Sequence, residues 1–440
     1  MVSHFFITFA SQLYNNERMR VLIVNTSERT GGAAVAASRL ADALCNNGVK
    51  AKMLVRDKET QRLIVSALPG QLRSQWHFLW ERFVVWCHLR LNRSHLFDID
   101  VACSGTDITK LPEFQEADVI HLHWVNQGML SLKGIRKLLD SGKPVVWTMH
   151  DIWPATSLCH LTLDCRRFET GCQQCRLLPH GGSANDLSAQ VWRKKQQMLE
   201  GRHVAFVACS EWLAGEARKS ALLQGQQVVS IPNPIDTHVY HPGSKEQARQ
   251  LLELPVEGRV ILFASQRVTN PYKGMTYLVE ACQLLAAQHP EQKEQISVAI
   301  LGGHAEEISG QLPFRTFPLG YINDETRIVA AYQAADVFVL PSLSENLPNT
   351  IMEAMACGVP SVAFRVGGIP EEIDHRQNGY VADYRSSEDL ARGLWWVLKE
   401  CDSAAVSKAC LQKVSQCYSQ QSVAKRYIEV YEGISSHDHV

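Results

Sequence analysis

The chain has 440 residues, and its 44 Lys and Arg nearly balance its 45 Asp and Glu, for a formal net charge of −1. One hydrophobic core stops growing at about 250–300 residues, so two domains are expected. The balanced charge argues against a nucleic-acid partner bound through a strongly basic surface. No apolar run reaches the length of about 20 residues that a membrane-spanning helix needs.

The N-terminal 18 residues differ in pattern from the rest of the chain. The stretch "HFFITFA" lacks the basic flank and cleavage site of a signal peptide, and the first clean strand pattern begins after Met19. We therefore interpret residues 1–18 as a disordered extension or an upstream start. Thirteen cysteines without an export signal are typical of reduced thiols, so a cytoplasmic location is expected.

Short β-branched runs alternate with amphipathic helical stretches along the whole chain, which is typical of parallel strands joined by crossover helices. A glycine turn, a helix and a glycine stop come after the first strand. The predicted strands are 20–25, 117–125, 143–151 and 203–210, and then 259–268, 296–303, 314–322, 335–342 and 359–368.

This pattern predicts an α/β protein with two doubly wound domains. The first covers 19–229, a proline-rich linker covers 230–243, and the second covers 244–418. The remaining residues, 419–440, are expected to form a helix and tail that cross back to the first domain. Ligands of such sheets bind at the carboxyl ends of strands, and two facing sheets would enclose a cleft.

Two glutamates stand out in the stretch 342–364. Glu345 lies in a loop after a strand, whereas Glu353 lies on a helix predicted from about Pro348 to a stop at Gly358. The start of that helix favours an anion such as a phosphate, and each carboxylate can accept hydrogen bonds from vicinal hydroxyls. This arrangement suits a nucleotide sugar. A helix cap beside a solvated or salt-bridged glutamate explains the spacing equally well.

The same stretch carries a family resemblance. The segments "SENLPNTIMEAMACGVP", "GGIPEEI" and "NGYVA" resemble the signature of family 4 (group 1) glycosyltransferases, which have the GT-B fold. Further landmarks occur in order along almost the whole chain: "GGAAVA", "TMHD", "IPNPID" and "SQRVTNPYKG". The resemblance implies that Glu345 holds the transferred sugar and that Glu353 holds the ribose of the donor.

The resemblance also extends to cations and glycines. It implies that Arg267 and Lys273 clamp the donor diphosphate, where fixed cations stabilise the charge of the leaving group. Gly31 and Gly32 match a glycine turn at which backbone amides approach a phosphate or the acceptor.

Two loop residues depart from the common pattern of the family. Asn346 and Leu347 stand where many relatives have a glycine and an aromatic residue, at positions that face the donor. We expect the loop to survive because asparagine tolerates the left-handed conformation. Pro234 replaces a glycine in the linker and is expected to stiffen it.

Histidines at two neighbouring strand ends come next. By the resemblance, His150 lies beside the transferred sugar. His121 and His123 are two apart, so they point to one face of their strand, where they either line the acceptor site or serve as ordinary structural residues.

The implied reaction is transfer with retention of configuration and without a catalytic metal. No carboxylate is placed as a nucleophile in the family, so the leaving phosphate is expected to help deprotonate the acceptor hydroxyl. The expected partners are a nucleoside diphosphate-sugar and a glycan or lipid-linked glycan of surface or exopolysaccharide synthesis. An epimerase of the same fold and a non-catalytic nucleotide-sugar-binding subunit are the alternatives.

A cysteine-rich loop at 157–178 resembles an insertion found in colanic acid and other exopolysaccharide glycosyltransferases. Its four cysteines fit either a structural zinc site or a packed loop, whereas disulfides are not expected in a reducing cytosol. These residues are Cys159, Cys165, Cys172 and Cys175.

Finally, a helix predicted at 72–93 places aromatic residues and Cys87 on one face, with arginines nearby. This helix either packs its aromatics on the core of its own domain, which is the favoured interpretation, or seats them at the inner surface of an anionic membrane. The residues concerned are Trp76, Trp80, Phe83, Arg73, Arg82, Arg90 and Arg93.

Overall fold

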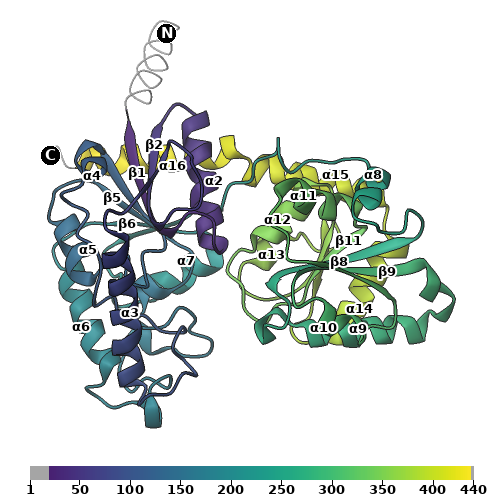
Figure 1. Ribbon diagram of the computed structural model, residues 1–440, viewed down its shortest axis with the longest axis horizontal. Helices are drawn as coiled ribbons and strands as arrows, with labels where there is room; N and C mark the ends of the chain where they lie inside the picture. The colour runs from purple at the N-terminus through teal and green to yellow at the C-terminus, as the bar shows by residue number, and fades with distance from the viewer. Residues whose placement is uncertain (1–18, 438–440) are drawn as a thin grey trace, which may run out of the picture. The chain divides into compact units, whose positions relative to one another are not determined.

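The computed structural model describes residues 19–437, which form two compact units (Figure 1). Unit 1 runs to Pro234 and resumes at Val423, and unit 2 comprises Ile235–Ser422. Residues 1–18 lie outside the described residues. No helix of the described chain is both long enough and apolar enough to cross a bilayer.

Unit 1 is built on a seven-stranded parallel sheet with the order β3-β2-β1-β4-β5-β6-β7. Its strands carry runs of Val, Ile, Leu and Ala that are buried on both faces, as expected for a parallel sheet covered by helices. The strands are β1 Arg20–Ser27, β2 Lys50–Asp57, β3 Val65–Ala67, β4 Val119–Leu122, β5 Val145–Met149, β6 Ala205–Ala208 and β7 Gln227–Ser230.

The helices of unit 1 connect these strands. They are α2 Gly32–Asn46, α3 Gln71–His88, α4 Pro112–Glu116, α5 Leu132–Leu139, α6 Leu187–Leu199 and α7 Glu211–Arg218, with 3-10 turns η1 Trp153–Ala155, η2 Arg167–Glu169 and η3 Pro179–Gly181.

Unit 2 is built on a six-stranded parallel sheet with the order β10-β9-β8-β11-β12-β13. Its strands are β8 Arg259–Arg267, β9 Ile296–Gly303, β10 Arg315–Gly320, β11 Val337–Leu340, β12 Ser361–Phe364 and β13 Gly379–Ala382. Both sheets are doubly wound, which confirms the predicted fold class.

The helices of unit 2 flank its sheet. They are α8 Lys245–Leu251, α9 Met275–Gln288, α10 Glu306–Ser309, α11 Glu325–Ala334, α12 Asn349–Ala356, α13 Ile369–Glu372, α14 Ser387–Trp395 and α15 Ser403–Lys413, with η4 Pro271–Lys273, η5 Pro290–Gln295 and the π-helical turns η6 Trp396–Glu400 and η7 Val414–Tyr418.

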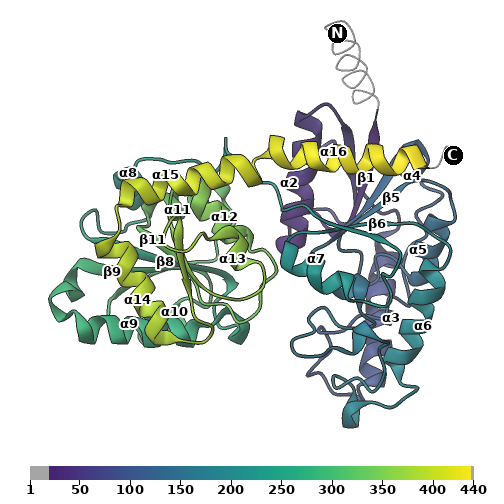
Figure 2. The same cartoon turned by 180° about the vertical axis from the view of Figure 1, so that it is seen from behind.

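The last helix, α16 (Gln420–His437), begins in unit 2 and ends in unit 1 (Figure 2). In unit 1 it buries an apolar face that includes Val423 and Ile428 against strands β1, β5 and β6. Two buried tyrosines extend this contact: the hydroxyl of Tyr427 lies 2.9 Å from that of Thr148, and the hydroxyl of Tyr431 lies 2.7 Å from Nδ1 of His121. The C-terminal segment is therefore an integral part of the core of unit 1.

Candidate functional site

The sheet order of unit 2 marks where a ligand should bind. From β8 the chain proceeds outward through β9 to β10 and then returns to place β11 on the other side of β8. Loops after β8 and β11 therefore diverge, and such a switch point is where open α/β sheets bind ligands. The predicted residues Arg267 and Lys273 lie at the end of β8 and in the loop after it, and Glu345 lies after β11.

An ion pair joins these two loops. Lys273 Nζ donates to Glu345 Oε1 at 2.6 Å, with the two side chains 31% and 13% exposed. A local turn sets the position of Lys273, because the side chain of Asn270 accepts from Tyr272 N at 3.0 Å. The carbonyl of Tyr272 in turn accepts from Leu343 N at 2.8 Å. The backbone as well as the side chains thus couples the two loops.

Two glycines allow the loops to approach this closely. Gly274 has φ 70°, and a Cβ there would lie 1.8 Å from the carbonyl oxygen of Pro341. Gly367, after β12, has φ 57°, and a Cβ there would lie 1.7 Å from the carbonyl oxygen of Glu345. Any other residue at these two positions would push the loops apart, so Gly367 of the sequence "GG" at 367–368 is explained by packing against the Glu345 loop.

Asn346 and Leu347 support the loop in a way that differs from the expectation. Asn346 is not among the residues with positive φ, so its tolerance of the left-handed conformation is not used. Instead its carbonyl accepts from Gly368 N at 2.7 Å, while Leu347 is buried. Both residues therefore hold the backbone that carries Glu345.

Glu353 lies on α12, which begins after Pro348 and ends before Gly358, as predicted. The glutamate is buried, and its Oε2 accepts from the hydroxyl of Tyr332 at 2.7 Å. The ring of Tyr332 packs edge-on against Tyr240 of the linker. Sequence reasoning missed Tyr332, which reads as an ordinary apolar position of α11; its only signal was a hydroxyl on an otherwise buried helix face.

Arg267 does not join this cluster. Its side chain is exposed at the end of β8, and its Nε donates to Thr269 Oγ1 at 3.0 Å. Among the described residues it makes no hydrogen bond or ion pair to Glu345. The predicted basic pair is thus divided between one cation in contact with the glutamate and one facing solvent.

A second carboxyl group lies near Glu345. Glu372 is fully buried, and neither of its side-chain oxygens has a hydrogen-bond partner among the described residues. Burial, and then the charges of Glu345 and Glu371, raise the pKa of Glu372 well above its usual range. Burial therefore favours the protonated form of Glu372, which lowers the negative charge beside Glu345.

Unit 1 has its own switch point, between β1 and β4. Gly31 has φ 94° and precedes α2, whose first residue is Gly32. Apart from the two neighbouring residues, no heavy atom of the described chain lies within 4 Å of a Cβ placed on Gly31, so the turn is exposed and unobstructed. The positive φ explains the glycine, and the open start of a 15-residue helix is suited to an anionic or hydroxylated group.

The three predicted histidines lie together in unit 1. His123 Nδ1 is 2.8 Å from His150 Nε2, and His150 Nδ1 is 3.5 Å from Cys209 Sγ. Burial lowers the pKa of His150 to about 4 and that of His123 well below its usual value, so both rings are neutral at physiological pH. Of the two interpretations of His121, the structure favours an ordinary structural residue, because its ring is fully buried and bonded to Thr148 and Tyr431.

Sequence reasoning also missed a network of charged side chains that lies next to His150 in the sequence, centred on His160. His160 contacts Asp151 through Nδ1 and Asp100 through Nε2, each at 2.7 Å. Burial alone would lower the pKa of His160, but the two carboxylates outweigh it and raise the pKa to about 10. The imidazolium therefore connects the end of β5 to the cysteine-rich loop.

The cysteine-rich loop has two interpretations, a structural zinc site and a packed loop, and the zinc site stays a prediction. No three His, Cys, Asp or Glu side chains within 19–437 are grouped so as to hold a metal ion. The four cysteines are free thiols, and Cys172 and Cys175 pack against the core of unit 1. The alternative of a packed loop is the one that the structure favours.

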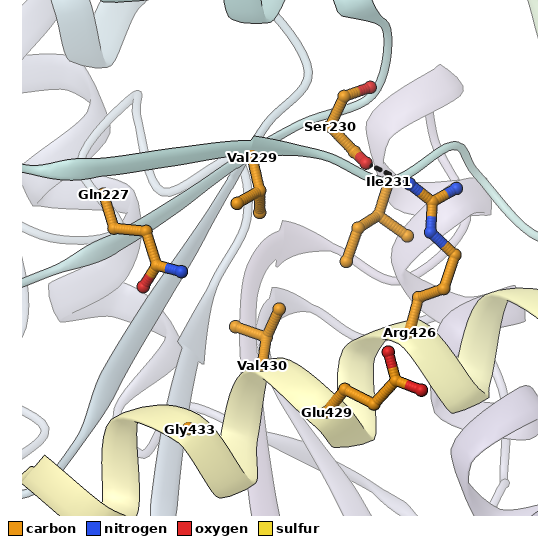
Figure 3. Close-up of a pocket in the computed structure, with 8 residues that line it drawn as sticks. All are labelled: Gln227, Val229, Ser230, Ile231, Arg426, Glu429, Val430 and Gly433. Atoms are coloured by element: carbon orange, nitrogen blue, oxygen red, sulfur yellow. Dashed lines mark hydrogen bonds between the residues drawn. The ribbon is translucent and has the colours of Figure 1, made fainter.

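A pocket elsewhere in unit 1 is unrelated to these residues. It lies between β7 and α16 and is lined by Gln227, Val229, Ser230, Ile231, Arg426, Glu429, Val430 and Gly433 (Figure 3). Arg426 donates to the carbonyl of Ser230, and Arg218 donates to that of Val228 at 3.1 Å. These contacts cap the free edge of the sheet, which is a common protection against edge-to-edge association.

Two family models match the chain in tandem. Residues 30–239 match "Glycosyltransferase Family 4", and residues 258–400 match "Glycosyl transferases group 1". The two matches fall on units 1 and 2 respectively.

Curated relatives are also glycosyltransferases, and solved structures share the fold. D-inositol 3-phosphate glycosyltransferases of Catenulispora acidiphila and Saccharomonospora viridis are 34% and 30% identical over 37% and 46% of the chain, which spans only 40% and 49% of their lengths. A sucrose-phosphate synthase from Thermosynechococcus elongatus has a TM-score of 0.64 at 19% identity, covering 96% of this chain and 100% of that one. Anabaena HepE in complex with UDP-glucose has a TM-score of 0.63 at 18% identity, covering 94% and 100%. The fold is GT-B.

The His160 ion pairs predict a specific dependence of stability on pH. Because the pKa of His160 is higher in the folded protein than in the unfolded chain, its stabilising contribution is complete below about pH 6.5 and is lost as the pH rises toward 10. In urea unfolding from pH 6.5 to 9.5, His160→Asn should be less stable than wild type at pH 6.5. As the pH rises, the difference in free energy of unfolding between wild type and His160→Asn should decrease by up to about 1.4 kcal/mol per pH unit. A gap that stays constant across this range would contradict the assignment of an imidazolium.

Proposed function

We propose that this family 4 glycosyltransferase moves a sugar from a nucleoside diphosphate-sugar to a glycan acceptor with retention of configuration. The observation that supports this most is the convergence of Lys273, Glu345 and the α12 start at the switch point of unit 2. Anabaena HepE, a structural neighbour, is described in complex with UDP-glucose, which is consistent with such a donor.

The donor's parts match the groups present. The start of α12 and the ammonium of Lys273 suit the diphosphate, because both present positive charge to it. Glu345 would accept hydrogen bonds from hydroxyls of the transferred sugar once a phosphate takes over Lys273 as its partner. Glu353, on the next turn of α12, would accept from the ribose hydroxyls.

The reaction is derived from charge placement. Departure of the nucleotide leaves negative charge on its diphosphate, which Lys273 and Arg267 would stabilise in place of a metal ion. Before the donor binds, Lys273 holds the Glu345 carboxylate in place, and the role proposed for Glu345 in the complex is to position the sugar. We propose that the leaving phosphate accepts the acceptor's proton on the same face of the sugar.

In unit 1, His150 is proposed to contact the transferred sugar. Its ring is neutral, so it can exchange hydrogen bonds with a hydroxyl without an ionic cost. Both ring nitrogens already have partners, His123 and Cys209. A sugar hydroxyl would displace the thiol of Cys209, the weaker of the two.

The acceptor is proposed from motif similarity alone. The cysteine-rich loop resembles that of the colanic acid branch, which suggests a lipid-linked intermediate of surface or exopolysaccharide synthesis. The curated relatives act, by their names, on D-inositol 3-phosphate, but the chain spans half or less of the lengths of the two quoted above.

Thermal shift against UDP-, GDP- and ADP-sugars tests the donor assignment. A ligand that binds only the folded state at 100 times its Kd adds about 2.7 kcal/mol to stability, so one nucleotide class should raise Tm clearly. Glu353→Ala should abolish the shift because the ribose loses its acceptor. No shift with any member of the panel, or an undiminished shift in Glu353→Ala, would contradict the proposed donor site.

Tyr332 is predicted to position Glu353 for the donor. Tyr332→Phe removes the hydroxyl that donates to Oε2 while keeping the ring contact with Tyr240, so Kd for the donor should rise about threefold to tenfold. Tyr321→Phe, which alters an exposed tyrosine of the same unit, should leave Kd unchanged. Equal Kd values for Tyr332→Phe and wild type by calorimetry, with only Tm lowered, would show a purely structural role.

A further inference from the structure

Helix α3 presents its apolar side outward. Five large apolar residues on it are between 42% and 83% exposed: Leu72, Trp76, Leu79, Trp80 and Phe83, which we call the α3 face. The favoured expectation that these aromatics pack on the core is therefore wrong. Figure 1 shows α3 in front of unit 1, and Figure 2 shows it behind, so the helix lies on the outside of its unit.

The aromatic rings of the α3 face form a continuous row. The centroids of Trp76 and Trp80 are 6.0 Å apart, and those of Trp80 and Phe83 are 5.8 Å apart. Phe83 in turn lies 6.2 Å from Trp86, and Leu91 and Phe97, after the helix, are exposed as well. An apolar surface of this extent is unusual on a protein that meets only water, and it indicates a docking surface.

Buried charges on the opposite side fix this orientation. Glu81 is fully buried and accepts from the backbone amides of Ala102 and Gly128 at 2.7 and 2.8 Å. Arg82 is buried beside it and pairs with Asp100. Rotating the helix to bury its tryptophans would remove Glu81 from the two amides and Arg82 from the buried carboxylate of Asp100, and leaving these buried groups without the bonds is costly. The outward apolar face is therefore built into the fold.

The exposed charges within residues 71–97 are positive, and the next carboxylate along the chain, Asp98, lies 2.8 Å from Nδ1 of His95. Residues 71–97 contain a single carboxylate, Glu81, and it is buried. Arg73, Arg90 and Arg93 are exposed, and neither Arg73 nor Arg93 pairs with a carboxylate within the described chain. Such a surface, with aromatic rings and with arginines that lack a carboxylate partner, complements a partner whose interior is apolar and whose surface is anionic.

We infer that the α3 face docks on an anionic lipid bilayer, with the tryptophans at the level of the headgroups and Arg73 and Arg93 on the phosphates. Tryptophan rings favour the membrane interface, and each basic residue near an anionic surface adds to binding. Docking goes beyond the proposed transfer reaction and does not require it. It would bring unit 1 to the place where lipid-linked acceptors are found.

Vesicle flotation of the full chain tests this inference. Wild type should float with vesicles of equal parts phosphatidylglycerol and phosphatidylcholine, and should stay in the soluble fraction with phosphatidylcholine alone. Binding should weaken in 1 M salt, where the Debye length is about 3 Å. Failure to float with the anionic vesicles, or equal flotation with both kinds, would overturn the inference.

Matched variants distinguish vesicle binding through the α3 face from nonspecific binding by other parts of the surface. Trp76→Ala with Trp80→Ala should lower the vesicle affinity at least tenfold, whereas Trp212→Ala, at a tryptophan as exposed as Trp80, should not. Arg73→Glu with Arg93→Glu should weaken binding by more than about fivefold per arginine, whereas Arg327→Glu with Lys408→Glu should not. Unchanged affinity in both α3 variants would overturn the inference.

Two further readouts separate lipid docking from loss of folding and from self-association. All variants should keep the wild-type Tm and donor thermal shift, because the α3 face contributes nothing to the donor site of unit 2; failure of the donor shift in wild type would therefore leave the docking result standing. Sedimentation should show a monomer. A dimer that the tryptophan variants dissociate would identify the face as a protein interface and overturn the lipid assignment.

Discussion

The contact between Lys273 and Glu345, at 2.6 Å, joins the loops that leave β8 and β11 on either side of the switch point in unit 2. Gly274 and Gly367, both at positive φ, allow their backbone to lie against the loop that follows β11. Helix α12 starts directly after that loop. The positive charge of Lys273 and the start of α12 are therefore held beside two carboxylates before any ligand arrives. A site arranged in advance loses less entropy on binding, which is why its supporting shell matters as much as its charges.

Buried polar contacts decide the orientation of elements in both units. In unit 2, Tyr332 fixes Glu353 from a helix 21 residues earlier in the chain. In unit 1, Asp100 and Gly128 hold the inner side of α3 and leave its aromatic side to solvent. Each of these groups would be costly to leave unpaired, so each constrains the fold more strongly than its small net contribution to stability suggests.

The local parts of this structure could be predicted from the sequence. Apolar runs identified nine of the thirteen strands and missed β2, β3, β7 and β13, while the proline and glycine around α12 marked its limits. Long-range partners could not be predicted. The periodicity of α3 identified its aromatic stripe but not which side is buried, because that depends on residues far along the chain. The spacing of four cysteines likewise could not distinguish a metal site from a packed loop.

Calorimetric titration of Lys273→Met with the nucleoside diphosphate that wild type prefers tests the central claim most directly. Methionine keeps most of the side-chain length and removes the charge. The account predicts that Kd rises about tenfold or more, equivalent to at least about 1.4 kcal/mol, with little change in Tm. An unchanged Kd would show that the diphosphate binds elsewhere and that the Lys273–Glu345 contact is only a structural ion pair.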